Sequence, residues 1–463
     1  MLGTISDFLW SYILIVMLVG LGLWFSIASR FVQFRYFGQM FRSLASGFHH
    51  QAGHVSSFQA LVVSVAGRVG GGNIAGVAVA ITLGGPGAVF WMWLIGLMGM
   101  ATSFFECSLA QLYKRAEPDG TYRGGPAYYM SHGLKKPWMA ALYSVLLLIT
   151  FGFGFNSVQS YIVATSVQAS FGIPPWMTGT FLAVALGFTI FGGIKRIAVV
   201  AEVVVPVMAV GYFLMALVVL AMNITEVPGV LMHIVRSALG FEEAVAGGFA
   251  AVVMQGVKRG LFSNEAGLGS APNVAAVAYV PHPANQGMVQ SLSVFIDTII
   301  MCSCTATIIL LSDVYQPGAA DVNGVALTQN ALAEHVGAWG QNFVSIALLL
   351  FAFSSIMYNY YLGENSLNYF SEENQHVFNV FRVLVLALVL WGSMQDLSTV
   401  FVFADLTMAL LGVVNLTALA MLMKVAFRLL KDYDDKRKTS AMPKFEPEAW
   451  SDLDIDPEAW RDN

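Results

Sequence analysis

Eleven long apolar segments constrain this chain more than any other feature of its sequence. A helix needs about 20 consecutive apolar residues to cross the hydrocarbon core of a bilayer. Only 11% of the 463 residues are charged, against about 25% in soluble domains. A transmembrane β-barrel would instead show alternating segments of about ten residues. We therefore predict an all-α integral membrane protein with eleven transmembrane helices, at 9–30, 58–84, 87–114, 137–170, 176–193, 197–222, 244–279, 286–312, 341–370, 377–393 and 398–427.

The basic residues predict the orientation of these helices, because Lys and Arg concentrate on the cytoplasmic side. If the N-terminus lies outside, 19 of the 23 Lys and Arg residues fall in cytoplasmic segments or at their edges. Arg236 falls in an outer loop, and Arg68, Lys258 and Arg259 fall within spans. We predict a plasma or bacterial inner membrane protein with its N-terminus outside and its C-terminus in the cytoplasm.

The second apolar segment is interrupted near its middle by residues that a lipid-facing helix avoids. Residues 64–81 are SVAGRVGGGNIAGVAVAI, with three consecutive glycines between Arg68 and Asn73. Irregular backbone at that depth is tolerated only where it is buried or lines a cavity. Glycines that only let helices pack closely usually occur singly at a spacing of four. The pattern therefore favours a broken helix.

A matching interruption lies about 190 positions later, in the segment 254–272, MQGVKRGLFSNEAGLGSAP. Each interrupted helix is followed by four ordinary segments. Because five is an odd number, the two five-helix halves have opposite orientations. This predicts an inverted repeat whose first helix is discontinuous in each half. We expect one transmembrane domain over 1–430, with repeats 58–222 and 244–430 after one N-terminal helix, and a cytoplasmic tail over 431–463.

A broken helix exposes backbone groups that have no partner within the helix. The half that starts near Asn73 directs free N–H groups and the positive end of its dipole at the break, which suits a carboxylate. The half that ends near Gly67 and Val69 offers free carbonyls, which suit Na⁺ or an ammonium group. Donors and acceptors that converge in this way predict a zwitterionic ligand, an amino acid, with a cation beside it.

The segments around the two breaks resemble the two signature regions of a known family. RVGGGNIAGVAVAITLGGPGAVFWMW and GLFSNEAGLGSAP are similar to those of the alanine or glycine:cation symporters, the sodium:alanine symporter family. Shorter similarities are RGGPAYYM, NSVQSY, VFIDT and DLTMALLGVVNL. The resemblance covers about residues 10–430. It implies the leucine-transporter (LeuT-type) fold with one helix in front, and Na⁺-coupled, sometimes H⁺-coupled, uptake of alanine, glycine and related amino acids.

The resemblance implies two cation sites beside the breaks. Asn73 resembles the amide that binds Na⁺ next to the substrate, although it could instead cap the second half-helix. Asp297 is an ionisable residue within a span and therefore a functional candidate; its alternative is an ion pair with Arg68 or Lys258. Serines on the helix 341–370 would supply hydroxyls, unless they only bond their own helix. The candidate cation ligands are Ala66, Val69, Asn73, Asp297, Thr298, Ser354 and Ser355.

The candidate substrate-binding residues surround the same breaks. Glycine N–H groups would hold the carboxylate, Gln159 would form a hydrogen bond with the substrate, and residues 262–265 would hold the amino group. The full set is Gly70, Gly71, Gly72, Asn73, Phe155, Gln159, Phe262, Ser263 and Asn264. Asp405 and Asn415 are weaker candidates, Glu106 is expected in a structural pair, and Arg68, Lys258 and Arg259 in cytoplasmic gating ion pairs.

Gly71 departs from the family pattern, in which Thr or Ser usually stands at this place. The lost hydroxyl removes one possible ligand contact and is expected to enlarge the pocket slightly. A larger substrate, such as glutamine or serine, therefore becomes an alternative to alanine or glycine.

These observations predict a secondary active transporter that imports a small neutral amino acid with Na⁺ by alternating access, and not an enzyme. The alternatives are an H⁺-coupled transporter of the same fold, a channel, and an amino-acid-sensing receptor that resembles a transporter. Expected partners are the amino acid, Na⁺ or H⁺ and membrane lipid, and no nucleic acid. The segment 31–56 is expected to be interfacial and amphipathic. The acidic tail 439–463, with its EPEAW and DPEAW repeats, is expected to be flexible or peripheral.

Overall fold

The computed structural model describes residues 5–6, 8–46, 54–118, 120–241, 248–316, 324–371 and 374–460, and these are almost entirely helical. Each predicted apolar segment contains a helix, which confirms the all-α membrane class. The α-helices are α2 (Ile15–Ala28), α3 (Val32–Arg35), α4 (Phe37–Ser46), α5 (Ser57–Arg68), α6 (Val77–Gly84), α7 (Gly87–Leu112), α8 (Pro126–Tyr128), α9 (Pro137–Leu147), α10 (Asn156–Phe171), α11 (Pro175–Ile190), α12 (Gly193–Met222), α13 (Val227–Ala238), α14 (Gly248–Asn264), α15 (Ser270–Ala275), α16 (Pro283–Val294), α17 (Cys302–Leu310), α18 (Gly324–Val336), α19 (Trp339–Ser371), α20 (Gln375–Ser393) and α21 (Leu397–Arg437).

Short elements complete the chain. Two-residue strands β1 (Arg115–Ala116) and β2 (Tyr122–Arg123) pair in antiparallel fashion after α7. Wider π-helical turns lie at Leu9–Leu14, Gly72–Gly76, Tyr129–Gly133, Leu148–Phe155 and Phe295–Met301, and 3₁₀ turns at Pro447–Trp450 and Glu458–Trp460.

Eight helical segments within the described residues are long and apolar enough to cross a membrane. A ninth is obtained if α5 and the following segment Gly72–Gly84, which are bent by 50° from each other, form one span. Of the remaining predicted spans, the segment 176–193 corresponds to the short apolar helix α11, and 244–279 corresponds to α14 and α15. The count of eleven transmembrane helices thus stays a prediction.

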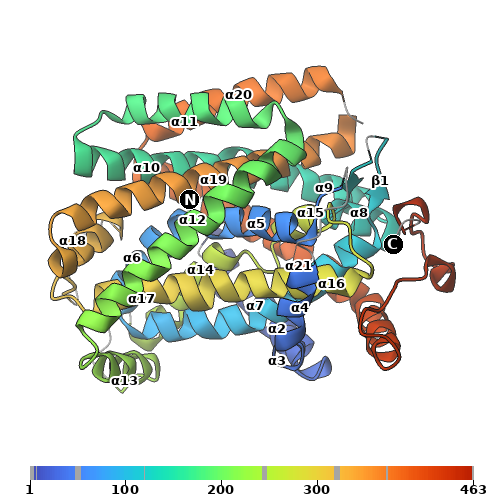
Figure 1. The fold of residues 1–463 in the computed structure, drawn as a ribbon, viewed down its shortest axis with the longest axis horizontal. Helices are drawn as coiled ribbons and strands as arrows, with labels where there is room; N and C mark the ends of the chain where they lie inside the picture. Colours follow the sequence, from blue (N-terminus) through green and yellow to red (C-terminus); the bar gives the residue numbers. More distant parts are fainter. Residues whose placement is uncertain are drawn as a thin grey trace.

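The long helices pack in two groups (Figure 1). In one, α7 lies against α14 and α16, and α5 lies against α15 and α16. In the other, α10 packs on α19 and α20, and α11 packs on α20. α12 crosses between the groups and contacts both α5 and α19. α6 packs against α14 and α7, so the two broken segments, α5–α6 and α14–α15, meet in one group, while α5 also packs against α19 of the other.

Exposed apolar side chains cover the outer helices, as a lipid-facing surface requires. On α12, Val199, Val203, Val207, Val210 and Leu214 lie one helical turn apart and are each more than half exposed. Water-soluble monomers rarely expose such a continuous apolar face, so this face fits contact with lipid.

The acidic tail is peripheral, and it packs against the body of the protein. Phe445, Trp450 and Trp460 are buried, and the Phe445 N–H donates to the Pro281 carbonyl at 2.8 Å. The ammonium group of Lys114, just after α7, lies between two aromatic rings, 4.2 Å from the centre of Trp460 and 4.1 Å from that of Tyr122. Figure 1 shows the tail at the end of the molecule remote from α13 and α18.

Ion pairs hold the acidic residues of the tail to the same end. Arg428 of α21 donates to Asp452 at 2.6 Å, and Arg115 donates to Asp454 at 2.9 Å. Partial burial opposes ionisation of Asp454, but hydrogen bonds with His132 and Arg115 outweigh it and hold the pKa of the Asp454 carboxyl below its usual 3.8. The tail thus joins α21 to the loop that follows α7.

Replacing Trp460 by alanine should release the tail. We expect Trp460→Ala to speed proteolytic cleavage of the tail about tenfold, the factor that ~1.4 kcal/mol of lost aromatic burial produces. Intact-mass spectrometry of the protein under limited proteolysis measures the rate. Glu448→Ala, at an exposed tail position, is the matched control and should leave the rate unchanged. Equal rates for the two variants would contradict the docked arrangement.

Candidate functional site

The first helix break follows α5 directly. α5 ends at Arg68, and Val69 leaves helical conformation with φ −81° and ψ 87°. The chain becomes helical again at the wide turn Gly72–Gly76. This whole segment is fully buried, so the polar groups freed by the break cannot be satisfied by bulk water and need partners within the protein.

Side chains satisfy the freed N–H groups. The Gly70 N–H donates to Asn73 Oδ1 at 2.9 Å, and the Gly71 N–H donates to Gln159 Oε1 at 3.1 Å. Two of the residues that the sequence singled out, Asn73 and Gln159, thus lie directly on the exposed backbone. A substrate carboxylate at this position would have to take over these N–H groups from them.

Close packing explains why glycines stand at the break. A Cβ atom at Gly67 would lie 2.3 Å from the ring of Tyr358, which is buried. A Cβ atom at Gly70 would lie 2.5 Å from Ser355 Oγ. Both neighbours belong to α19, so the absence of side chains lets the end of α5 approach this helix closely.

The space beside Gly71 is already filled. A Cβ atom there would lie 2.6 Å from Ile162 Cδ1 and 3.1 Å from Gln159 Oε1. In this conformation glycine leaves no extra space at this point, because the end of the Ile162 side chain of α10 occupies the volume that a Thr or Ser side chain would take. Any effect of Gly71 on the size of the substrate must therefore act together with Ile162.

Asp297 is the acidic centre of the site and is fully buried. Its carboxylate accepts hydrogen bonds from Asn73 Nδ2 at 2.6 Å and from Thr298 Oγ1 at 2.6 Å. The Ser263 hydroxyl lies 3.0 Å from both carboxylate oxygens. Residues from the first break, the second broken helix and the turn Phe295–Met301 thus meet at one carboxylate.

The basic residues lie elsewhere. Arg68 donates to the Gln290 carbonyl and Ser103 Oγ, each at 3.0 Å, and also to Ser293. Within the described part of the chain, Asp297 forms no ion pair with a basic side chain. Its alternative role as the partner of Arg68 or Lys258 is therefore wrong for this conformation.

Lys258 and Arg259 pair with Asp405. Lys258 Nζ lies 2.7 Å from Asp405 Oδ2, and Arg259 lies 3.7 Å from the same oxygen. Asp405 is near the start of α21, whereas the tail follows its other end. Lys258 and Arg259 thus form ion pairs, as expected, and these involve the part of α21 that is remote from the tail. That the pairs are cytoplasmic and act in gating stays a prediction.

An unpaired carboxylate in this interior favours a bound cation. A buried charge is costly unless it is compensated. Within the described residues, Asp297 has hydroxyl and amide neighbours and no ion pair, and Arg68 acts on it electrostatically without contacting it. Carboxylate and hydroxyl oxygens are the ligands that hard cations prefer. Asp297, Thr298 and Ser263 together offer such oxygens, while Asn73 Oδ1 is engaged by the Gly70 N–H.

The second predicted cluster also comes together. Ser355 Oγ donates to the Ala66 carbonyl at 2.8 Å, and Ser354 Oγ lies 3.4 Å from the same oxygen. Both hydroxyls also bond the Phe351 carbonyl of their own helix, at 3.0 and 2.8 Å. Val69, at the end of α5, is fully buried beside them. Helix back-bonding and contact with the broken helix thus occur together.

Aromatic rings cover the first break. Phe155 and Phe262 stack with their centres 5.0 Å apart and their planes at 21°. A Cβ atom at Gly72 would lie 3.1 Å from the Phe262 ring. The two rings come from the two packing groups, so the backbone of the break is enclosed where these groups meet.

The second break joins α14 to α15 through left-handed backbone conformations at Glu265 (φ 56°), Gly267 (φ 89°) and Gly269 (φ 84°). Such a conformation is unusual for glutamate, and its carboxylate is held by Ser270 Oγ at 2.6 Å and by the Tyr358 hydroxyl at 3.2 Å. Its side chain is also buried, so the unusual conformation makes Glu265 a further candidate site residue.

Glu106 and Asn415 form hydrogen bonds with the backbone of the second break. The Gly267 N–H donates to Glu106 Oε1 at 3.2 Å, and Asn415 Nδ2 donates to the Gly267 carbonyl at 2.8 Å. Glu106 and Asn415 are thus structural partners of the unwound backbone. Asn264 is not part of the Asp297 cluster: its Oδ1 accepts from the Ala266 N–H at 2.9 Å.

Sequence reasoning missed three neighbours of the site. Tyr358 and Ile162 contact the glycines, and Cys302 Sγ lies 3.2 Å from Ser263 Oγ. They stand in apolar helices with nothing in the local pattern to mark them. Only the spacing of Tyr358 from Ser354 and Ser355, about one helical turn, could have placed it on the same face.

Wide π-helical turns carry key candidates. Asn73 lies in Gly72–Gly76, Phe155 ends Leu148–Phe155 and Asp297 lies in Phe295–Met301. Such turns are rare and frequent at functional sites, because they redirect a side chain and loosen the helix hydrogen bonds.

Two broken helices that meet at a buried polar centre within an all-helical membrane protein are characteristic of secondary transporters. The chain belongs to the sodium:alanine symporter family, whose sequence profile matches residues 1–447. The family is one of transporters, and no enzymatic activity is indicated.

Curated relatives match nearly the full length of the chain. It is 46% identical to the amino-acid carrier protein AlsT of Bacillus subtilis, over 95% of this chain and 93% of the relative. It is also 46% identical to the probable sodium/glutamine symporter GlnT of Bacillus subtilis, over 96% and 92%. The sodium/proton-dependent alanine carrier protein of Bacillus sp. is 38% identical, over 88% and 94%.

Gly67→Ala should destabilise the folded protein. The added methyl group would meet the buried Tyr358 ring, and such overpacking costs about 1–3 kcal/mol. We expect a fall of several degrees in Tm, measured by thermal unfolding in detergent. Gly76→Ala, in the same broken segment but with open space around its Cβ position, is the control. A Gly67→Ala variant as stable as Gly76→Ala would refute the contact.

Proposed function

We propose that this protein imports a small neutral amino acid together with Na⁺, driven by the Na⁺ gradient and without covalent chemistry. The observation that carries the proposal is the buried Asp297 carboxylate, which hydroxyl and amide groups from both broken helices surround and which forms no ion pair within the described residues. Binding of Na⁺ there would compensate the charge and join the two breaks.

A second Na⁺ would bind between α5 and α19. The Ser355 hydroxyl and the Ala66 carbonyl are 2.8 Å apart, with Ser354 beside them. Val69 would add the last carbonyl of the broken half-helix. A cation at this position would link the two packing groups directly, and its binding would shift the equilibrium between conformations.

The amino acid would bind at the first break. The N–H groups of Gly70, Gly71 and Gly72 would hold its carboxylate, and Gln159 would turn from the Gly71 N–H to the substrate. Phe155 and Phe262 would close the pocket. Alanine and glycine fit a site enclosed by these rings. Glutamine, named for one relative, is the larger alternative.

The architecture that we propose is an inverted repeat of the LeuT type, with eleven spans and repeats over 58–222 and 244–430. The N-terminus would lie outside, and the tail in the cytoplasm. The two packing groups support this, since both broken helices lie in one of them. Alternating access would result from this group rocking against the other.

Proton coupling is the second candidate. Asp297 is itself a titratable group, and some relatives carry names that include proton dependence. Protonation would neutralise the buried charge as Na⁺ does. The two ions can be distinguished because only Na⁺ needs several oxygen ligands, whereas a proton needs the carboxylate alone.

Uptake by purified protein in liposomes tests the function. We expect labelled alanine to accumulate under an inward Na⁺ gradient and not under a matched K⁺ gradient, with glycine, serine and glutamine as competitors. Asp297→Asn and Asn73→Ala should each reduce uptake to the level of empty liposomes. Glu226→Gln, an exposed acid outside the site, is the control and should transport normally.

Other outcomes would lead to other conclusions. Accumulation under a proton gradient alone would assign H⁺ coupling, and binding without accumulation would indicate a receptor. Wild-type uptake by Asp297→Asn would overturn the cation site.

Ser355→Ala tests the second cation position separately. We expect the Na⁺ concentration for half-maximal uptake to rise about tenfold, because one oxygen ligand worth about 1–1.5 kcal/mol is lost. Ser366→Ala is the matched control, since Ser366 lies on the same helix and bonds only its own backbone, at 2.8 Å. If both variants change the Na⁺ dependence equally, Ser355 acts only on the helix.

A further inference from the structure

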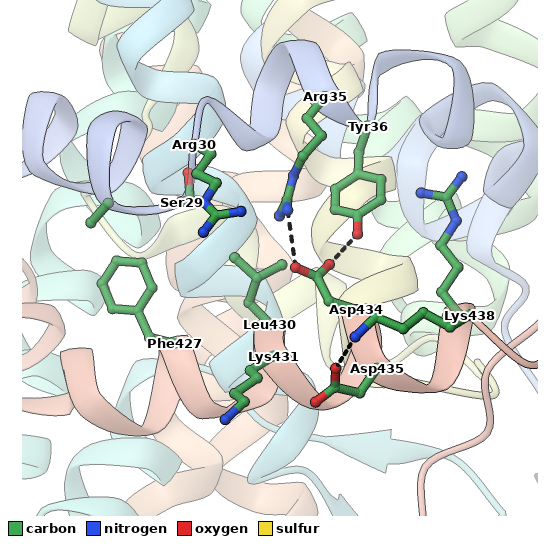
Figure 2. A pocket seen from close by; sticks show the side chains of 12 residues that line it. Ser29, Arg30, Arg35, Tyr36, Phe427, Leu430, Lys431, Asp434, Asp435 and Lys438 are labelled. Atoms are coloured by element: carbon green, nitrogen blue, oxygen red, sulfur yellow. Dashed lines mark hydrogen bonds and ion pairs between the residues drawn. The ribbon is translucent and has the colours of Figure 1, made fainter.

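A polar cavity lies where the first transmembrane helix meets the last, outside the transport site (Figure 2). One wall is the turn after α2, where Arg30 and Phe31 adopt left-handed conformations (φ 57° and 56°). The other wall is the last part of α21, from Phe427 to Lys438. The cavity has a volume of about 720 Å³, within the range of small-molecule sites.

Positive charge dominates the lining of this cavity. The lining contains two acidic residues, Asp434 and Asp435. It contains five basic residues: Arg30, Arg35, Lys431, Arg437 and Lys438. The formal excess of three positive charges comes from two segments about 400 positions apart in the sequence. An anionic ligand is therefore the chemistry that the cavity favours.

The acidic residues are already engaged. Asp434 accepts hydrogen bonds from Arg35 at 3.0 Å and from the Tyr36 hydroxyl, and Asp435 pairs with Lys438 at 2.6 Å. Figure 2 shows these contacts along one side of the cavity, with Arg30 on one wall and Lys431 on the other. Within the described residues, the side chains of Arg30 and Lys431 form no hydrogen bond or ion pair, and Lys431 acts on Asp435 only electrostatically. Their charges remain available.

Tyr36 and Arg437 shape the far side of the cavity. The guanidinium of Arg35 lies 4.6 Å from the centre of the Tyr36 ring, and that of Arg437 lies 4.9 Å from it. The ring thus holds two like charges near each other, an arrangement that an anion between them would stabilise. Arginine guanidinium groups bind phosphate oxygens in pairs.

Apolar surface continues from the cavity along the same two helices. Trp24 and Ile27 of α2 are 53% and 61% exposed, and Met421 of α21 is 46% exposed. Trp24 Nε1 lies 2.8 Å from Met423 Sδ, so the helices are adjacent on the side that faces lipid. A basic cavity at the end of an apolar surface matches a molecule with an anionic head and hydrocarbon chains.

We propose that this cavity binds the phosphate headgroup of an anionic membrane lipid. The phosphate of the lipid lies between Arg30 and Lys431. The acyl chains of the lipid follow the exposed side chains of α2 and α21. The bound lipid ties the turn after α2 to α21, the helix that continues into the tail. This inference is independent of the transported substrate and requires only that the protein spans a membrane.

The test compares phosphatidylglycerol with phosphatidylcholine on purified, delipidated protein. Native mass spectrometry counts bound lipid, and thermal unfolding in detergent measures its effect on Tm. We expect phosphatidylglycerol to bind and to raise Tm in the wild type. Arg30→Gln/Lys431→Gln should bind it about 30-fold more weakly, the factor expected for two lost charges at a membrane surface.

Two further variants serve as controls. Lys135→Gln/Lys136→Gln removes two charges outside the cavity and should bind phosphatidylglycerol as the wild type does. Arg30→Lys/Lys431→Arg keeps the charges and should retain most of the affinity. Loss of binding in the first of these, or wild-type binding by Arg30→Gln/Lys431→Gln, would overturn the site.

Inorganic phosphate distinguishes a lipid from a free anion. We expect millimolar phosphate alone to leave Tm unchanged, because the acyl chains contribute to binding. If phosphate stabilises the wild type as strongly as phosphatidylglycerol does, and Arg30→Gln/Lys431→Gln abolishes the effect, the ligand is a soluble anion and the lipid assignment is wrong. An equal response to phosphatidylcholine would also refute it.

Discussion

The interior of a membrane protein offers its backbone no bulk water, and the rest of this structure depends on that constraint. Two helices are broken within the protein, and each freed polar group needs a partner from elsewhere. Asn73 and Gln159 serve the first break, and Glu106 and Asn415 serve the second. The helices that supply these partners must therefore pack around the breaks, so the demand for hydrogen bonds determines which helices are neighbours.

The same demand creates the chemistry of the site. A partner that satisfies an exposed N–H or carbonyl can be displaced by a ligand of matching polarity, and glycines allow the ligand to reach the backbone. Asp297 adds a charge with which no basic side chain among the described residues forms an ion pair. Under the function that we propose, a mobile cation compensates this carboxylate, and its binding and release accompany conformational change.

Charges near the ends of the helices have a separate role. Lys258 and Arg259 join α14 to α21 through Asp405, and at the other end of α21 ion pairs hold the tail. Between the last part of α21 and the turn after α2 lies the basic cavity with its excess of positive charge. α21 is thus linked to its neighbours at both ends. Near its start, Asp405 pairs with α14, and near its end, Arg428 pairs with the tail.

The sequence alone determined the all-α membrane class, the positions of the apolar segments, both interruptions and the family. These depend on hydropathy, on glycine and on short motifs, which are local properties. It also indicated Asn73, Gln159, Asp297 and Ser355, since polar groups are conspicuous in an apolar chain. Only the tertiary structure decided that Ile162 fills the space beside Gly71, that Asp405 pairs with Lys258 and that the tail docks. Such contacts join residues far apart in the chain, and their geometry follows from how whole helices pack, which no local pattern encodes.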